Sequence, residues 1–262
     1  MITSTSNAKV KRLVNLKKKR KLRDTEKVFL VEGIRMFREA PEDKIAEIYV
    51  TESFLNKQNK LIQEKSKMSG APVEILSDTV FEYASDTKTP QGILCVVRQM
   101  NDTIREVAGG ERPLLLVLDN LQDPGNLGTI VRTAEGAGVT GILMSKDCVD
   151  IYNPKTIRST MGSIYRMPFS YEENLLEAIE DLKKKGIHTY AAHLEGACVY
   201  DEEDYREGSA FFIGNEGNGL RDEIARSAER YIKIPMCGQV ESLNAAIAAS
   251  VLMFEAARQR RV

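Results

Sequence analysis

The sequence predicts an α/β protein of two domains, the second built on a mostly parallel sheet with helices on both faces. Two observations lead to this fold class. Short apolar runs alternate with helical stretches along most of the chain, and one polar segment with a Gly-Gly pair separates two such series. The chain has 262 residues, 42% of them hydrophobic and 29% charged, as is typical of a globular protein with a sizeable core.

The first series predicts a small α/β domain at residues 27–98, followed by a polar linker at 99–112. Its apolar runs are short and are separated by charged helical sequence, so strands and a crossover helix account for the pattern. The predicted elements are a strand and helix at 27–40, strands at 44–51, 72–77 and 91–98, and a charged helix at 52–68.

The second series predicts a larger domain at residues 113–262. It begins with "PLLLVLDNL", a continuous apolar run typical of a strand buried in a parallel sheet. Strands then alternate with helices, which favours an open parallel sheet covered on both faces. The predicted strands are 113–121, 141–145, 187–194, 210–214 and 231–236, and the predicted helices are 127–138, 153–163, 174–186 and 242–260.

Several classes of protein are disfavoured by composition. No apolar run reaches the ~20 residues of a membrane-spanning helix, and the N-terminus lacks the apolar region of a secretory signal. The four cysteines are scattered without a C-x-x-C pair, which predicts reduced thiols and no zinc site. The sequence therefore predicts a cytoplasmic protein that binds no metal and does not associate with membranes.

A basic segment opens the chain, and we expect residues 1–26 to form a basic N-terminal arm. Residues 1–23 contain nine lysines and arginines and no acidic residue, whereas the chain as a whole has a net charge of −1. A concentrated basic segment on an acidic body favours attraction to a polyanion, most often nucleic acid. A solvated basic helix face or a disordered tail is the alternative interpretation.

Three predicted strand ends are rich in glycine and small polar residues, and ligands of open α/β sheets bind at such carboxyl ends. The glycines of the middle segment follow a G-x-x-G-x-G spacing, which is not the dinucleotide fingerprint, and neither a Walker A loop nor a G-x-S-x-G elbow is present. Turns that need glycine for their backbone angles are the structural alternative. The three segments are 120–128, 214–220 and 235–244.

Individual polar residues in these segments have ordinary structural explanations as well as functional ones. Arg132 and Glu135 lie three residues apart on a predicted helix and would share a face as a surface ion pair. Asn126 follows a Pro-Gly turn and would suit an N-cap. Ser242 and Asn244 precede an alanine-rich helix, where capping explains Ser242 better than Asn244.

Taken together, the three segments resemble the motifs of the SpoU (TrmH) family of RNA ribose 2′-O-methyltransferases, within the SPOUT superfamily. The resembling stretches are "LDNLQDPGNLGTIVRTAEGAGV", "FFIGNEGNGL" and "IPMCGQVESLNAAIAASVLMFE", in the family's order across residues 113–258. Residues 27–98 resemble, more weakly, the substrate-binding domain of the rRNA-modifying members. The minimal tRNA-modifying members lack that domain, so rRNA is favoured as substrate.

The resemblance implies a catalytic SPOUT domain at residues 113–262 with a deep trefoil knot, S-adenosylmethionine as methyl donor, and a homodimer. The implied reaction methylates a ribose 2′-hydroxyl, with 23S rRNA as the expected substrate. A tRNA ribose 2′-O-methyltransferase and a non-catalytic protein that binds RNA or assists ribosome assembly are the alternatives. An oxidoreductase that uses a nucleotide cofactor is disfavoured because its fingerprint is absent.

The resemblance also implies the site residues, position by position. Two roles stay open for Arg132, as the base that accepts the hydroxyl proton or as a clamp on the substrate phosphate, and Glu216 is expected to orient Arg132 or Asn126. The implied active-site residues are Asn126, Arg132, Glu216, Ser242 and Asn244, and the implied methyl-donor contacts are Leu194, Gly196, Gly214, Ile234, Met236 and Leu243.

Overall fold

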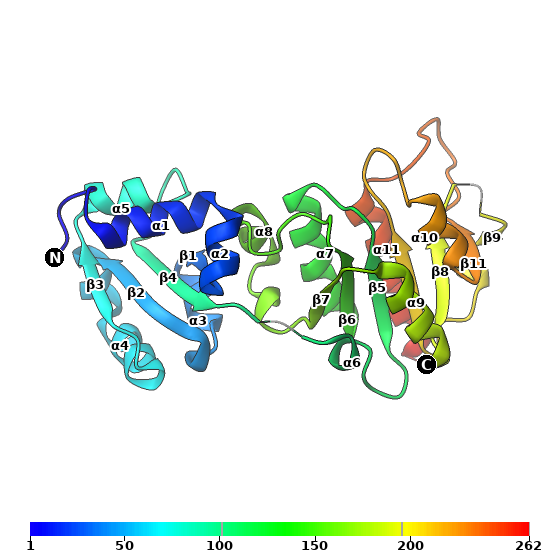
Figure 1. The fold of residues 1–262 in the computed structure, drawn as a ribbon, viewed down its shortest axis with the longest axis horizontal. Coiled ribbons are helices and arrows are strands. Elements are labelled where there is room, and N and C mark those ends of the chain that lie inside the picture. The colour runs from blue at the N-terminus through cyan, green and yellow to red at the C-terminus, as the bar shows by residue number, and fades with distance from the viewer. Residues whose placement is uncertain (101, 195, 262) are drawn as a thin grey trace. The chain divides into compact units, whose positions relative to one another are not determined.

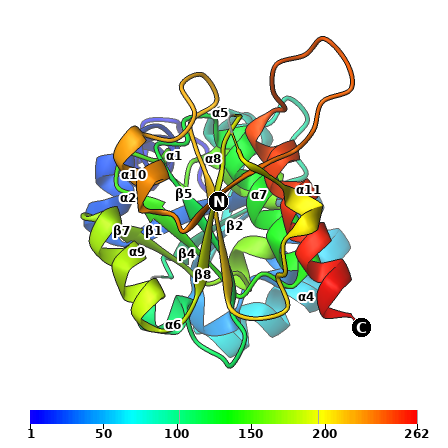
Figure 2. The ribbon, with the colours of Figure 1, turned by 90° about the vertical axis from the view of Figure 1, so that its right-hand side faces the viewer.

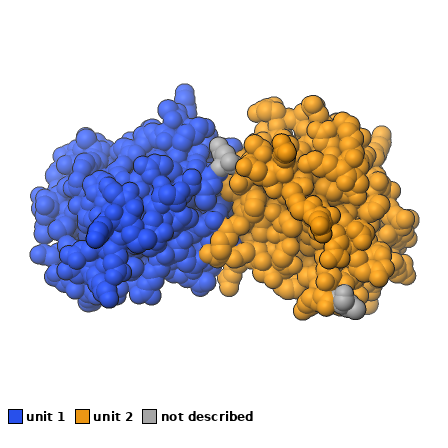
Figure 3. Space-filling view, turned by 90° about the horizontal axis from the view of Figure 1, so that it is seen from below, with its two compact units in different colours: residues 1–100, 150–165 blue, residues 101–149, 166–262 orange. Residues whose placement is uncertain are grey.

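The computed structural model describes residues 1–100, 102–194 and 196–261, and it divides the chain into two compact units (Figure 3). Unit 1 contains residues 1–100 and 150–165, and unit 2 contains residues 101–149 and 166–262. The boundary after Met100 falls within the predicted linker, one residue of which, position 101, lies outside the described residues. Within the described ranges, no helix has the length and hydropathy that crossing a bilayer requires.

Unit 1 is built on a four-stranded sheet with the order β1-β4-β2-β3 (Figure 1). Strands β1 and β2 run antiparallel to β4, and β3 runs parallel to β2. This arrangement matches the four strands predicted for the first series. Their bounds are β1 Val28–Glu32, β2 Ile45–Thr51, β3 Val73–Leu76 and β4 Ile93–Arg98.

Helices cover both faces of the unit 1 sheet, with α1 and α5 on one face and α3 and α4 on the other (Figure 1). The crossover helix α4 follows the predicted charged stretch closely, whereas α5 is a short helix that the sequence pattern did not reveal. The helices are α1 Ala8–Lys18, α2 Arg20–Glu26, α3 Ile34–Glu39, α4 Glu52–Ser69 and α5 Asp78–Ala84, with a 3-10 turn at Glu42–Lys44.

The N-terminal segment is helical and packed, which differs from the arm expected at residues 1–26. Val10, Leu13 and Leu16 recur at helical spacing, and all three are fully buried in the core beneath α1. The basic residues therefore decorate the outer face of a helix that belongs to unit 1. This outcome agrees with the alternative interpretation of a solvated basic helix face.

One segment from the second half of the sequence also belongs to unit 1, which differs from the single domain expected at residues 113–262. Residues 150–165 contain α8 (Pro154–Thr160) and a 3-10 turn at Ser163–Tyr165. Buried Asp150 pairs with buried Arg23, whose Nε lies 3.0 Å from its Oδ2, and the Tyr152 ring lies 4.5 Å from that of Phe29. These long-range contacts leave no local trace in the sequence.

Unit 2 is built on a seven-stranded sheet with the order β7-β6-β5-β10-β8-β11-β9, and every neighbouring pair in it is parallel. The predicted parallel sheet is confirmed, and the short edge strands β7 and β9 are additions to it. The strands are β5 Leu114–Leu118, β6 Gly141–Ser145, β7 Phe169–Glu172, β8 His188–Ala192, β9 Cys198–Val199, β10 Ser209–Ile213 and β11 Arg230–Lys233.

Helices lie on both faces of this sheet as predicted (Figure 2). One face carries α6, α9 and α10 over a core that includes Leu115, Val117 and Phe212, and α11 packs beside α7 on the other face. The helices are α6 Ile104–Val107, α7 Pro124–Ala137, α9 Leu175–Lys184, α10 Asp222–Ser227 and α11 Ala245–Arg260, with a 3-10 turn at Tyr200–Glu202.

Candidate active site

The three glycine-rich segments follow β5, β10 and β11, which are parallel strands of one sheet. Their carboxyl ends therefore lie along the same edge of unit 2. The segment after β5 leads into α7, the one after β10 leads into α10, and the one after β11 leads into α11. The loops that the sequence singles out thus project from a common edge, and side-chain contacts join all three.

Glu216 is the centre of these contacts. Its carboxylate accepts hydrogen bonds from the backbone N–H of Gln122 at 3.1 Å, the backbone N–H of Asp123 at 3.0 Å and the Nδ2 of Asn126 at 2.9 Å. Partial burial raises the pKa of Glu216, but the Asn126 amide and the backbone donors outweigh it, so the pKa lies below its ordinary value. The structure therefore holds Glu216 as a carboxylate that fixes the first loop.

Asn126 links this carboxylate to the third loop. Its Oδ1 accepts a hydrogen bond from the Nδ2 of Asn244 at 3.0 Å, and the Oδ1 of Asn244 accepts from the backbone N–H of Ala246 at 2.9 Å. Three of the five expected active-site residues thus form one continuous chain, Glu216–Asn126–Asn244. Of the two partners expected for Glu216, the structure selects Asn126.

The capping expectations for these residues are wrong. Asn244, and not Ser242, is the N-cap of α11. The N-cap of α7 is Asp123, whose Oδ1 accepts from the backbone N–H of Asn126 at 2.8 Å, so the side chain of Asn126 is free to bridge Glu216 and Asn244. The turn pattern misplaced the start of each helix. The N-cap of α7 lies three residues before Asn126, and the N-cap of α11 lies two residues after Ser242.

Arg132 and Ser242 are exposed and lie outside this chain of hydrogen bonds. Within the described part of the chain, neither side chain has a hydrogen bond or an ion pair. The surface pair expected between Arg132 and Glu135 is also not formed, since Glu135 pairs with Arg166, whose Nε lies 2.5 Å from its Oε1. The Arg132 guanidinium is therefore uncommitted and available to an anionic partner.

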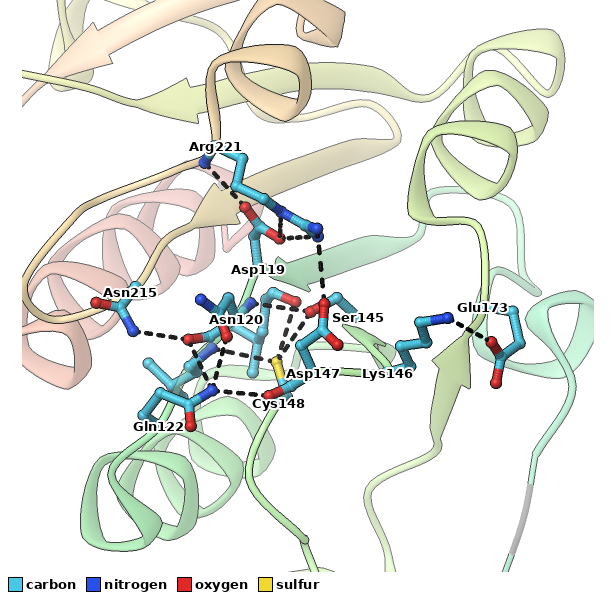
Figure 4. Close-up of polar contacts among 12 residues, drawn as sticks. Asp119, Asn120, Gln122, Ser145, Lys146, Asp147, Cys148, Glu173, Asn215 and Arg221 are labelled. Carbon is cyan, nitrogen blue, oxygen red and sulfur yellow. Dashed lines mark hydrogen bonds and ion pairs between the residues drawn. The ribbon is translucent and has the colours of Figure 1, made fainter.

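Two further contacts, which sequence reasoning missed, join the first two loops (Figure 4). Asn215 donates from Nδ2 to the carbonyl oxygen of Asn120 at 2.9 Å. Arg221 donates from Nε to Oδ1 of buried Asp119 at 2.9 Å and from its backbone N–H to Oδ2 at 2.9 Å. An acidic residue directly after a buried strand, and an arginine directly after the glycine loop, were the available signals.

Three glycines at this edge of unit 2 are needed by the chain itself. A Cβ on Gly214 would lie 2.1 Å from the carbonyl carbon of Gly219, and one on Gly196 would lie 2.7 Å from the carbonyl carbon of Ile232. Gly219 has a φ of +70°, in the left-handed region that glycine favours. Glycine at 214 and 196 therefore lets backbone segments approach each other, and only Gly219 has the backbone angle that the structural alternative anticipated.

The expected methyl-donor contacts lie on loops at the same edge and offer apolar surface together with backbone groups. Leu194 has 67% of its surface exposed, and Ile234, Met236 and Leu243 are half-buried on the long segment between β11 and α11. This mixture suits an adenosine, whose base and ribose need apolar cover and backbone hydrogen bonds. Among the described residues, no group of three or more His, Cys, Asp or Glu side chains could hold a metal ion.

Comparison with known families finds two matches that divide the chain as the two series do. Residues 113–254 match the SpoU rRNA Methylase family, and residues 7–95 match the MRM3-like substrate binding domain. The second match begins near the start of α1, which agrees with the packing of that helix in unit 1.

Individual relatives resemble the chain over nearly its whole length. The 23S rRNA (guanosine(2553)-2′-O)-methyltransferase RlmP of Bacillus subtilis is 32% identical over 97% of this chain and 97% of its own. The AdoMet-bound rRNA methyltransferase of Sinorhizobium meliloti has a TM-score of 0.87 at 31% identity, covering 98% and 97% of the two chains. The AdoMet complex of AviRb from Streptomyces viridochromogenes has a TM-score of 0.89 at 25% identity, covering 97% and 98%.

Proposed function

The chain belongs to the SpoU rRNA methylase family, and from that premise we propose that it methylates a ribose 2′-hydroxyl of 23S rRNA at the edge of the unit 2 sheet. It is an S-adenosylmethionine-dependent RNA methyltransferase. The observation that carries the proposed site is the Glu216–Asn126–Asn244 chain, which joins all three family motifs through side-chain hydrogen bonds. A protein that only bound RNA would have no need of this arrangement.

The chain's own residues supply positioning and charge. Bound S-adenosylmethionine supplies an electrophilic methyl group on a sulfonium, and backbone groups around Gly214, Ile234, Met236 and Leu243 would hold its adenosine, with Leu194 and Gly196 beside it. The ribose hydroxyl is a weak acid that must lose its proton as it attacks. Asn126 and Asn244, fixed by Glu216, present amide groups that are already oriented before substrate arrives.

We propose that Arg132 stabilises the negative charge that develops on the ribose 2′-oxygen. A guanidinium stays protonated and is a poor base, whereas its planar fork suits a phosphate and a developing alkoxide. The exposed and uncommitted side chain of Arg132 fits the role of clamp. Proton acceptance by Arg132, with help from the substrate phosphate, is the alternative role, and Ser242 completes the expected set beside Asn244.

Unit 1 is proposed to bind the RNA substrate. Its match to the substrate-binding domain supports this role, and that domain is the reason why rRNA is favoured over tRNA. Four lysines of α1, α2 and their junction are exposed, and their side chains have no hydrogen bond or ion pair in the part of the chain that the structure describes. These lysines are Lys11, Lys18, Lys19 and Lys21.

Three further properties belong to the same proposal. We propose a homodimer formed through unit 2, supported by the exposed apolar residues Ile247 and Phe254 on α11. A deep trefoil knot in unit 2 is supported by topology, because α11 follows β11 near one edge of the sheet and yet packs beside α7, which follows the central strand β5. A cytoplasmic location accords with a ribosomal RNA substrate and with the four free cysteines.

The experiment that tests this function is methyl transfer from labelled S-adenosylmethionine to total RNA that lacks modifications, followed by mapping of the labelled nucleotide. A 2′-O-methyl group at one position of 23S rRNA is the expected result. Label in tRNA would support the proposed methyl transfer but would show that 23S rRNA is not the substrate. No transfer, together with no binding of S-adenosylmethionine, would favour the non-catalytic RNA-binding alternative.

A further inference from the structure

Asp119 is a buried charge at the start of the first loop. It follows the last residue of β5, and its side chain is 0% exposed. A carboxylate in such a place is costly unless charged donors surround it. Arg221 provides them, with its Nε at 2.9 Å and its Nη2 at 2.5 Å from Oδ1, and its backbone N–H at 2.9 Å from Oδ2.

Arg221 also connects three strand exits. It directly follows the glycine loop after β10, and its Nη1 lies 3.6 Å from Oδ2 of Asp147, which follows β6 (Figure 4). The hydrogen bond to Asp119 raises the pKa of Arg221, although burial lowers it, so the side chain stays charged. Its guanidinium therefore fixes the end of the Glu216 loop to the exits of β5 and β6, which lie on one side of β10.

The beginning of the same loop is fixed in a similar way. Asn215 donates to the carbonyl oxygen of Asn120, and Asn120 in turn donates from its backbone N–H to Oγ of Ser145 at 2.9 Å. Glu216 thus lies between two anchors, Asn215 and Arg221. These two residues bind the consecutive residues Asn120 and Asp119. Between these anchors the Glu216 carboxylate accepts hydrogen bonds from Gln122, Asp123 and Asn126.

We propose that Asp119 and Arg221 are positioning residues that hold the Glu216 carboxylate against the first loop and so set the geometry of Asn126 and Asn244 for methyl transfer. This inference rests on the proposed function for its effect on rate. Its effect on the Glu216 contacts can be measured without any activity. The pair acts through Glu216, so its contribution to the rate should disappear when Glu216 can no longer act.

The test is a double-mutant cycle between the pair and Glu216. The Asp119→Asn/Arg221→Gln variant removes both charges together and so avoids leaving a buried carboxylate unpaired. At saturating RNA and methyl donor we expect kcat to fall by at least ~10-fold in this variant and in Glu216→Gln. Combining all three substitutions should cost little more than Glu216→Gln alone, because the effects are coupled.

Hydrogen exchange gives the second readout. The backbone N–H groups of Gln122 and Asp123, which donate to Glu216, should exchange faster in Asp119→Asn/Arg221→Gln than in the wild type. Arg226→Gln is the matched control, because Arg226 lies on α10, is strongly exposed and pairs with Asp222 at 3.6 Å. The control should leave both kcat and exchange unchanged.

Losses of rate that multiply in the combined variant would overturn the inference. So would unchanged exchange at Gln122 and Asp123, or a lower melting temperature with full kcat, which would make the pair purely structural. If the wild type itself transferred no methyl group, the proposed function would fail, and the exchange measurement would still decide whether the pair positions Glu216.

Discussion

At the scale of single residues, Arg132 and Glu216 differ in how the fold holds them. Glu216 accepts three hydrogen bonds from the first loop, whereas Arg132 is exposed on α7 and its side chain has no partner among the described residues. A side chain that contributes little to the folded state can be replaced without loss of stability. The exposed side chain of Arg132 is therefore consistent with the proposed interaction with substrate.

Replacing Arg132 should separate catalysis from stability. We expect Arg132→Lys and Arg132→Ala to lower kcat by about 10²–10³-fold, because lysine lacks the planar fork and alanine lacks the charge. The melting temperature should change by less than about 1 °C, since the side chain is exposed and unpaired. Glu135→Gln, on the next turn of α7, is the control that should retain activity. Near-normal turnover of Arg132→Lys would reject both roles considered for this arginine.

Replacing Glu216 should produce an effect on stability that depends on pH. The folded-state pKa of Glu216 is lowered, so its contribution is complete above the ordinary value of 4.5 and is lost as the pH falls through the folded-state pKa. Glu216→Gln places an amide N–H₂ against donors, and we expect the melting temperature to fall by about 2–4 °C at pH 7. The difference in melting temperature between the wild type and Glu216→Gln should disappear below pH 4.5. A difference that increased in acid would contradict the assigned contacts.

At the scale of elements, the basic segment divides into structural and exposed residues. Arg12 donates to Glu26 and Glu47, and Arg23 is buried against Asp150, so these two arginines hold unit 1 together. The side chains of the four exposed lysines named above form no hydrogen bond or ion pair among the described residues. Deleting the whole segment would therefore remove part of the core, including Leu13, and would not isolate RNA binding.

Neutralising the four lysines is the sharper test of RNA binding. Changing Lys11, Lys18, Lys19 and Lys21 to Gln should weaken RNA binding. The slope of log Kd against the logarithm of the salt concentration should also fall by about 3, since each phosphate contact contributes ~0.7–0.9 to that slope. Changing exposed Lys57, Lys60 and Lys67 of α4, on the other face of the sheet, is the control. An unchanged salt dependence in the fourfold variant would place the RNA elsewhere.

The sequence predicted the main elements of both units because their patterns are local. Continuous apolar runs marked β4, β5 and β6, and the three glycine-rich strand ends marked the site edge. Short elements such as α5, α10 and β9 escaped because seven or fewer residues carry little periodicity. The pairing of Asp119 with Arg221 and of Asp150 with Arg23 escaped because each joins residues more than a hundred positions apart.

At the scale of the whole molecule, α11 offers a surface for self-association. Ile247 and Phe254 are 50% and 49% exposed and lie seven residues apart, which places them on one face of the helix. Exposed apolar side chains grouped in this way favour a protein interface. The proposed homodimer would bury them.

Introducing a charge on this face should dissociate the homodimer. We expect the wild type to have twice the mass of one chain by light scattering, and Phe254→Asp to shift the mass toward that of one chain. Met68→Asp, an equally drastic change at an exposed residue of α4, should leave the mass unchanged. A wild type that is already monomeric would remove the dimer from the proposal.

The central claim is that this chain places a 2′-O-methyl group on 23S rRNA with the residues gathered at one edge of unit 2. The most direct measurement is nucleoside mapping of 23S rRNA from cells that lack the gene, with and without the wild-type gene or its Arg132→Ala variant restored. The account predicts that one 2′-O-methyl group is absent without the gene, returns with the wild type and stays absent with Arg132→Ala. Ribosomal RNA with identical ribose methylation in all three strains would contradict it.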